Sequence, residues 1–145
     1  MIIISACLCG CNCKYNGENN KNEQCVKLFK EGKAILICPE QLGGLSTPRT
    51  PCEIIENNGL IKVVNKLDED LTENFKKGAE EALKLAKLVN AKVAILKENS
   101  PSCGSSFIYD GTFSNNKIKG IGITAKKFVE NGIKVFSEND IPKNI

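Results

Sequence analysis

Three short apolar runs are the feature of this sequence that most constrains its fold. The run IIIS spans residues 2–5, AILIC spans 34–38 and VAIL spans 93–96. Each is as long as a strand and apolar almost throughout, which is typical of strands buried on both faces of a parallel sheet. Helical patterns separate the runs, over residues 22–30 and from Thr72 onwards. The alternation predicts an α/β fold: a single compact domain with a mainly parallel, Rossmann-like sheet flanked by helices.

Turn and cap signals complete this prediction. Asn58-Gly59 predicts a hairpin turn between two short strands, and Asp110-Gly111 predicts a second, shorter hairpin within residues 107–113. Thr72 is expected to cap the long helix that follows it. The other expected elements are a rigid loop rather than a helix over 39–51, which holds three prolines and two adjacent glycines, a second rigid loop over 98–106, a helix over 124–131 and a last strand at 135–136.

Length and charge limit the class of protein. A chain of 145 residues with 41% hydrophobic residues is expected to form one domain over 1–145. Its apolar N-terminus is only a strand long and lacks a basic leader, and no run approaches about 18 apolar residues, so a cytoplasmic protein without a membrane partner is expected. The net charge of +3 comes from dispersed lysines, so intact nucleic acid is not an expected partner. The sequence does not indicate an oligomeric state.

Eight cysteines and no histidine give the chain its chemical character. Thiolates without imidazole suit zinc, copper(I) or an iron–sulfur cluster. The alternating run of cysteines over 7–13, Cys38 and Cys103 each follow a predicted strand, and ligands of parallel sheets bind beyond the carboxyl ends of the strands. We therefore expect these thiols to meet at one edge of the sheet. The chain has no C-x-x-C pair, so a cleft-bound cofactor fits better than a zinc knuckle, but spacing alone leaves zinc and iron–sulfur open.

Several motifs together resemble the thiouracil desulfidase family over essentially the whole chain. They are SACLCGCNCKYNG at 5–17, CPEQLGGLSTPRTPCE at 38–53, AILKENSPSCG at 94–104, IYDGTF at 108–113 and GIGITA at 120–125. The resemblance implies a [4Fe-4S] cluster held by only three cysteines, so that one iron has no protein ligand. It also implies non-redox removal of sulfur from a thiolated nucleobase.

The same resemblance assigns the cysteines. Family cysteines correspond to Cys7, Cys13, Cys38 and Cys103. The expected cluster ligands are Cys7, Cys13 and Cys103, with Cys38 possible instead of one of these. The sequence departs from the family pattern at four further positions whose role it does not predict, Cys9, Cys11, Cys25 and Cys52.

An open iron is expected to bind the soft sulfur of a thiocarbonyl while water attacks the carbon. Glu40 follows a strand end where the resemblance places a catalytic carboxylate, and is the expected general base. Ser100 is expected to orient the water or to donate to the ring, with Ser102 as its competitor. Arg49 either contacts the substrate or pins its loop, and Tyr15 either stacks on the base or packs beneath the cysteines.

Rival interpretations remain open at the level of sequence. A cofactor-free sulfur carrier would need one reactive thiol that forms a persulfide. A zinc or copper buffer would need only the N-terminal cysteines, and an electron-transfer protein would need a fourth cluster ligand. Iron and sulfide content separates these classes. The sequence does not choose among 2-thiouracil, 4-thiouracil, a thionucleoside and a fragment of thiolated tRNA as the physiological substrate.

Overall fold

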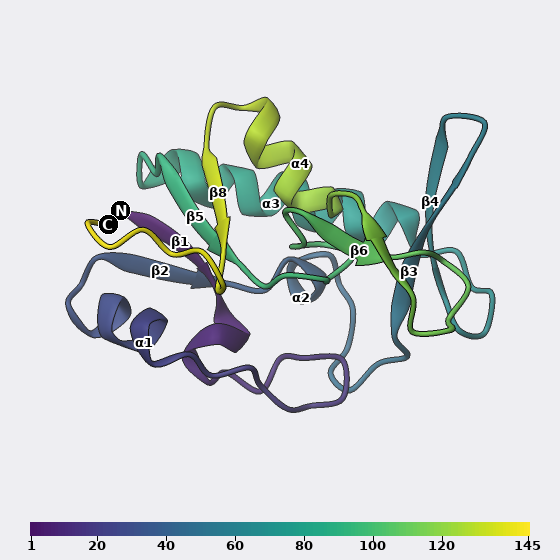
Figure 1. Cartoon of the computed structure of the whole chain (residues 1–145), viewed down its shortest axis with the longest axis horizontal. Helices are drawn as coiled ribbons and strands as arrows, with labels where there is room; N and C mark the ends of the chain where they lie inside the picture. The colour runs from purple at the N-terminus through teal and green to yellow at the C-terminus, as the bar shows by residue number, and fades with distance from the viewer.

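A four-stranded parallel sheet forms the centre of the computed structural model, which describes residues 1–145 (Figure 1). Its strands are β1 (Ile2–Ser5), β2 (Ala34–Ile37), β5 (Val93–Leu96) and β8 (Lys134–Ser137). They lie in the order β2-β1-β5-β8, and every neighbouring pair is parallel. The predicted α/β fold with a mainly parallel sheet is therefore confirmed.

Helices cover both faces of this sheet. Helix α1 (Glu23–Lys30) packs on one face, and α3 (Thr72–Leu88) and α4 (Ile123–Glu130) pack on the other. Ile3 belongs to the buried cluster under α3 and α4, whereas Ile2 and Ile4 belong to the cluster under α1. Successive strand residues point to opposite faces, so burial of both faces explains why the first run is apolar at each of its three isoleucines. No helix has both the length and the apolar character that crossing a membrane requires.

A long hairpin extends from one end of the molecule (Figure 1). It consists of β3 (Cys52–Asn57) and β4 (Leu60–Asn65), which pair in antiparallel register. The turn residues Asn58 and Gly59 have φ values of 52° and 79°. Both lie in the left-handed region that a two-residue hairpin turn requires, so this predicted turn is confirmed.

The second hairpin differs from its prediction. Strands β6 (Phe107–Tyr109) and β7 (Lys117–Lys119) pair across a loop of residues 110–116, so Asp110-Gly111 opens a long loop instead of forming the tight turn. The carboxylate of Glu53 on β3 explains the difference, because it accepts the backbone N–H groups of Gly111 and Phe113. These two bonds hold the loop against β3.

The prediction of a loop over residues 39–51 was wrong for its first four residues, which are helical. Residues Pro39–Leu42 form the short helix α2. Proline occupies its first position, where a backbone N–H would have no partner within the helix. Helix α2 lies backbone to backbone against α3. A Cβ on Gly78 of α3 would lie 2.0 Å from the carbonyl oxygen of Pro39, and one on Gly43 would lie 2.1 Å from that of Asn74. This close approach sets the position of α2.

The expected cap of α3 was also wrong. Thr72 is the first helical residue, and Leu71 holds the cap position without a side-chain bond. The Thr72 hydroxyl instead accepts the backbone N–H of Val63 at 2.9 Å and donates to Asp70 at 2.5 Å. Thr72 therefore ties the helix to β4, while Asp70 accepts the Thr72 backbone N–H. These bonds from Thr72 hold the pKa of Asp70 below its ordinary value.

Candidate active site

The segments that follow β1, β2 and β5 line a cavity of about 490 Å³ at the carboxyl edge of the sheet. Cys7 and Cys13 follow β1, Cys38 follows β2 and Cys103 lies in the loop after β5. All four thiols line this cavity. The meeting of three separate cysteine-bearing segments, expected from the order of elements along the chain, is thus observed.

Three of these thiols affect one another's titration. The Cys13 thiol, as a neighbouring proton donor, lowers the pKa of Cys38 to about 7 and lowers the pKa of Cys7 as well. The pKa of Cys13 is raised in turn, because Cys38 and Cys7 both stabilise its protonated form.

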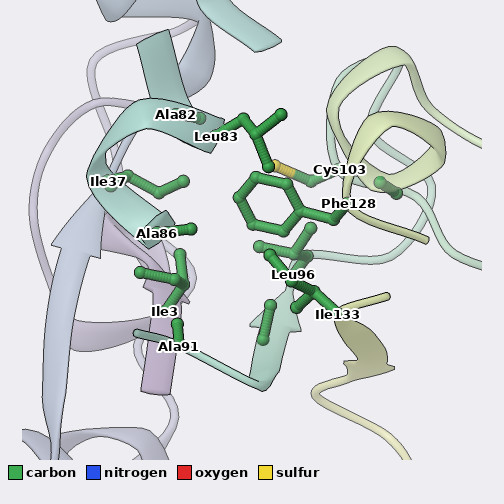
Figure 2. Packing of buried hydrophobic residues seen from close by; sticks show 12 residues of the cluster. Ile3, Ile37, Ala82, Leu83, Ala86, Ala91, Leu96, Cys103, Phe128 and Ile133 are labelled. Carbon is green, nitrogen blue, oxygen red and sulfur yellow. The ribbon is translucent and has the colours of Figure 1, made fainter. Parts of the chain in front are cut away.

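Cys103 is bonded differently from the other three. It is 3% exposed and belongs to the buried cluster that contains Leu83 and Phe128 (Figure 2). Burial raises the pKa of this thiol to about 12. The Ser5 hydroxyl donates to the Cys103 sulfur at 3.3 Å, while its own oxygen accepts the backbone N–H of Lys97 at 3.0 Å. Sequence reasoning missed Ser5, whose only signal was its place at the end of the first strand.

The remaining cysteines divide between two environments. Cys9, Cys11 and Cys25 do not line the cavity, and of these Cys11 is exposed while Cys25 lies on the buried face of α1. Cys52 is buried on β3 and does line the cavity, although sequence reasoning gave it no role. Burial raises the pKa values of both Cys25 and Cys52 to about 12.

Glu40 lies in the first turn of α2, and both its oxygens have partners. Oε1 accepts from Arg49 Nε at 3.0 Å, and Oε2 accepts from the Ser102 hydroxyl at 2.8 Å. The Ser100 hydroxyl lies 3.5 Å from Oε2. The carboxylate is only 14% exposed, so these partners fix its direction within the cavity.

Ser100 and Ser102 act together at this carboxylate. Their hydroxyl oxygens lie 2.9 Å apart. The Ser100 oxygen also accepts the backbone N–H groups of Ser102 and Cys103, each at 3.1 Å. Ser100 therefore shapes the loop, and Ser102, which is 2% exposed, makes the shorter contact with Glu40. The structure brings both competing serines to Glu40.

Arg49 joins three segments of the site. Its guanidinium donates to the Glu40 carboxylate, to the Cys13 carbonyl at 2.8 Å, and to the loop residues Ser46 and Thr47. Its side chain is 8% exposed, and its backbone N–H donates to the Tyr15 carbonyl at 2.7 Å. Of the two roles considered for Arg49, this geometry favours the pinning of loops.

Tyr15 lies at the cavity with a largely open side chain. It is 40% exposed, and the Lys14 ammonium lies 5.7 Å from the centre of its ring. The ring is therefore not packed beneath the cysteines, although Tyr15 lines the cavity.

A charged group beside the site was not found from the sequence. The Lys97 ammonium pairs with Glu138 at 2.9 Å, joining the ends of β5 and β8. The buried carboxylate of Glu98 accepts three successive backbone N–H groups, those of residues 105–107, at 3.0, 3.0 and 3.1 Å. The sequence signal that could have indicated these contacts was the charged pair Lys97-Glu98 directly after the buried strand β5. These contacts hold the loop that carries Ser100 and Cys103.

Comparison with known proteins identifies the family of this chain. A family model described as 2-thiouracil desulfurase matches residues 2–140. The chain is 50% identical over 147 residues to the uncharacterized protein YbbK of Bacillus subtilis (strain 168), and the match covers 97% of each chain. The solved structure of the [4Fe-4S]-dependent thiouracil desulfidase TudS is 41% identical, with a TM-score of 0.90 over 98% of this chain and 93% of that one. The resemblance carried by the motifs is thus confirmed, and the chain belongs to the 2-thiouracil desulfurase family.

Proposed function

We propose that this chain is a thiouracil desulfidase that exchanges the sulfur of a C=S group for oxygen without net oxidation or reduction. One water molecule is consumed, the C–S bond breaks, a C–O bond forms and sulfide leaves. The single observation that carries the proposal is the position of Glu40, whose hydrogen-bonded carboxylate lines the same cavity as five thiols. Membership of the family and 41% identity to TudS support the same chemistry.

The donor set fits the cofactor named for TudS. No group of three cysteine or carboxylate side chains is placed so that it could coordinate a single metal ion. Five thiols nevertheless line one cavity, and the Ser5 hydroxyl donates to that of Cys103, a contact of the kind that tunes a cluster thiolate. Cys7, Cys13 and Cys103 would hold a [4Fe-4S] cluster, with Cys38 possible instead of one of these. When bound, its iron without a protein ligand would supply a Lewis acid for the thiocarbonyl sulfur.

The chain's own residues supply the proton chemistry. Glu40 takes a proton from the attacking water at Oε2, as a general base. Arg49 holds the opposite oxygen, so the basic oxygen keeps its direction while the proton moves. Ser102 and Ser100 keep this oxygen oriented towards the cavity through their hydroxyl groups. The nucleobase itself, free or as a nucleoside, is the proposed substrate, because the cavity is small and basic side chains do not dominate it.

The test begins with protein purified without oxygen. Iron, acid-labile sulfide and zinc are measured per chain, and 2-thiouracil and 4-thiouracil are supplied without added reductant or oxidant. We expect about four iron and four sulfide per chain, and uracil and sulfide released in equal amounts. Full turnover by a metal-free chain would instead show that the reaction does not need the cluster. A chain that binds only zinc and releases no uracil would identify a metal buffer.

A further inference from the structure

The cavity has a second wall that the proposed chemistry does not use. The loop of residues 110–116 joins β6 to β7, and its residues Phe113 and Asn115 line the cavity together with Tyr109 at its start. Tyr15 lines the cavity from the cysteine-bearing segment. Both tyrosines of the chain, and one of its six phenylalanines, are therefore gathered at this one cavity.

The need for a buried core does not explain these rings. Phe75 and Phe128 are 1% and 0% exposed and belong to the buried clusters. Phe113, Tyr109 and Tyr15 belong to none of the three clusters, either as members or as partly buried neighbours. Their side chains contribute aromatic surface to the cavity instead.

Phe113 takes an unfavourable backbone conformation in order to lie there. Its φ of 57° is in the left-handed region, which glycine adopts freely and bulky residues rarely adopt. Such a conformation persists only where the surrounding structure enforces it, and it clusters at ligand sites. Here a phenylalanine occupies a position for which glycine is the better backbone choice.

Contacts with β3 enforce this conformation. The Glu53 carboxylate accepts the backbone N–H of Gly111 at 2.9 Å and that of Phe113 at 3.2 Å. Gly111 lies so close to β3 that a Cβ would be 2.8 Å from the carbonyl oxygen of Ile54. Glu53 is itself 9% exposed, so a buried carboxylate holds the loop in place. The loop is fixed with its aromatic residue at the cavity.

We propose that the loop 110–116 recognises the ring of the substrate, with Phe113 packed on the face of a planar heterocycle. Tyr109 and Tyr15 complete an aromatic surface around that ring. The Asn115 side chain has both a donor and an acceptor, which match the N–H and C=O groups along the edge of a pyrimidine base. This inference rests on the proposed function and adds that the substrate must be a flat aromatic ring rather than any thioamide.

The test uses Phe113→Gly in the cluster-loaded protein. Glycine removes the ring but suits the left-handed backbone, so the fold is retained and the melting temperature does not fall. We expect the KM for 4-thiouracil and the calorimetric Kd for uracil to rise about tenfold, with kcat changed far less. Phe113→Tyr keeps a ring and is expected to bind as the unaltered chain does. Phe107→Ala is the matched control, because Phe107 is 43% exposed on the same hairpin and does not line the cavity.

Unchanged KM and Kd in Phe113→Gly would overturn the inference. So would a rise of equal size in Phe107→Ala, since a general effect on the hairpin would then explain it. If the unaltered chain releases no uracil from thiouracil yet binds uracil in a way that depends on Phe113, the proposed function fails and the ring site stands. If it neither reacts with thiouracil nor binds uracil, both fail.

Discussion

The hydroxyl oxygen of Ser102 lies 2.8 Å from Oε2 of Glu40, although 62 residues separate the two in the chain. Glu40 belongs to the segment after β2 and Ser102 to the loop after β5, and β1 lies between these strands in the sheet. The contact therefore crosses above the end of β1, where Cys7 leaves the sheet. The strand order thus brings a carboxylate and its hydrogen-bond donors to the end of the sheet where the thiols lie.

Glu40→Gln tests the carboxylate as the general base. Glutamine keeps the size of the side chain and can still accept from Arg49, but it cannot take a proton from water. We expect kcat for thiouracil to fall by about 10²- to 10⁴-fold. Iron and sulfide per chain are expected to be unchanged, because no thiol is altered. Turnover and iron content are measured on the same preparation.

Glu80→Gln is the matched control for this change. Glu80 is exposed on α3, so the same removal of charge should leave turnover unchanged. If Glu40→Gln retains both its iron and its full rate of desulfuration, Glu40 is not the base.

Ser100→Ala is predicted to weaken the fold as well as the site. The Ser100 oxygen accepts two backbone N–H groups, those of Ser102 and Cys103, for which the structure shows no other acceptor. Leaving them unpaired should cost about 1–3 kcal/mol of the free energy of unfolding. Urea denaturation measures this loss. Ser106→Ala serves as the control, because the Ser106 hydroxyl is exposed and makes no hydrogen bond. Equal stability of the two variants would refute the role given to Ser100.

Gly78→Ala should destabilise the chain although it lies inside a helix. Alanine favours the helix by about 1 kcal/mol, but its methyl group would meet the Pro39 carbonyl oxygen at 2.0 Å. Overpacking of this kind costs about 1–3 kcal/mol, so the net effect is a loss. Displacement of α2 should also lower kcat, since α2 carries Glu40.

Lys77→Ala separates this contact from helix propensity. Lys77 is the exposed neighbour of Gly78 on α3, and its replacement should leave stability and turnover nearly unchanged. Thermal unfolding and kcat are compared for the two variants. A more stable Gly78→Ala chain would mean that α2 is free to move away from α3.

The sheet and the meeting of the cysteines could be predicted because both follow from local rules. A strand buried on both faces is apolar at every position, so the runs at 2–5, 34–38 and 93–96 were visible without any structure. Ligand sites of parallel sheets lie beyond the carboxyl ends of the strands, and the cysteines follow those ends. The hairpin turn at Asn58 and Gly59 could be predicted for the same reason, because the two turn residues themselves carry its signal.

Contacts between distant segments could not be predicted. Helix α2 is four residues long, too short to show a helical period, and it depends on close packing between Pro39 and Gly78 of α3. The Ser5 hydroxyl bonds to Cys103 across 98 residues, and the length of the loop after Asp110 depends on the Glu53 carboxylate. In each case the partner residue is ordinary in its own local sequence.

Four Cys→Ser variants test the proposed cluster ligands. Iron and acid-labile sulfide are measured per chain after purification without oxygen. We expect Cys7→Ser, Cys13→Ser and Cys103→Ser to lose most of their iron, because a serine oxygen is a poorer ligand for iron–sulfur clusters than a thiolate. Cys38→Ser is expected to keep its cluster.

Cys103 and Cys38 differ in the hydrogen-bond partners of their sulfur atoms, and this difference is the reason to expect Cys103 rather than Cys38 as a ligand. The Ser5 hydroxyl donates to the Cys103 sulfur at 3.3 Å, as an outer partner of a metal-bound thiolate does. The Cys38 sulfur instead makes a longer contact of 3.8 Å to the Cys13 carbonyl and has no hydroxyl partner. Cys11→Ser is the control, since that thiol is exposed and does not line the cavity, and it should retain full iron. Retention of the cluster by Cys103→Ser together with its loss from Cys38→Ser would exchange the roles of these two residues.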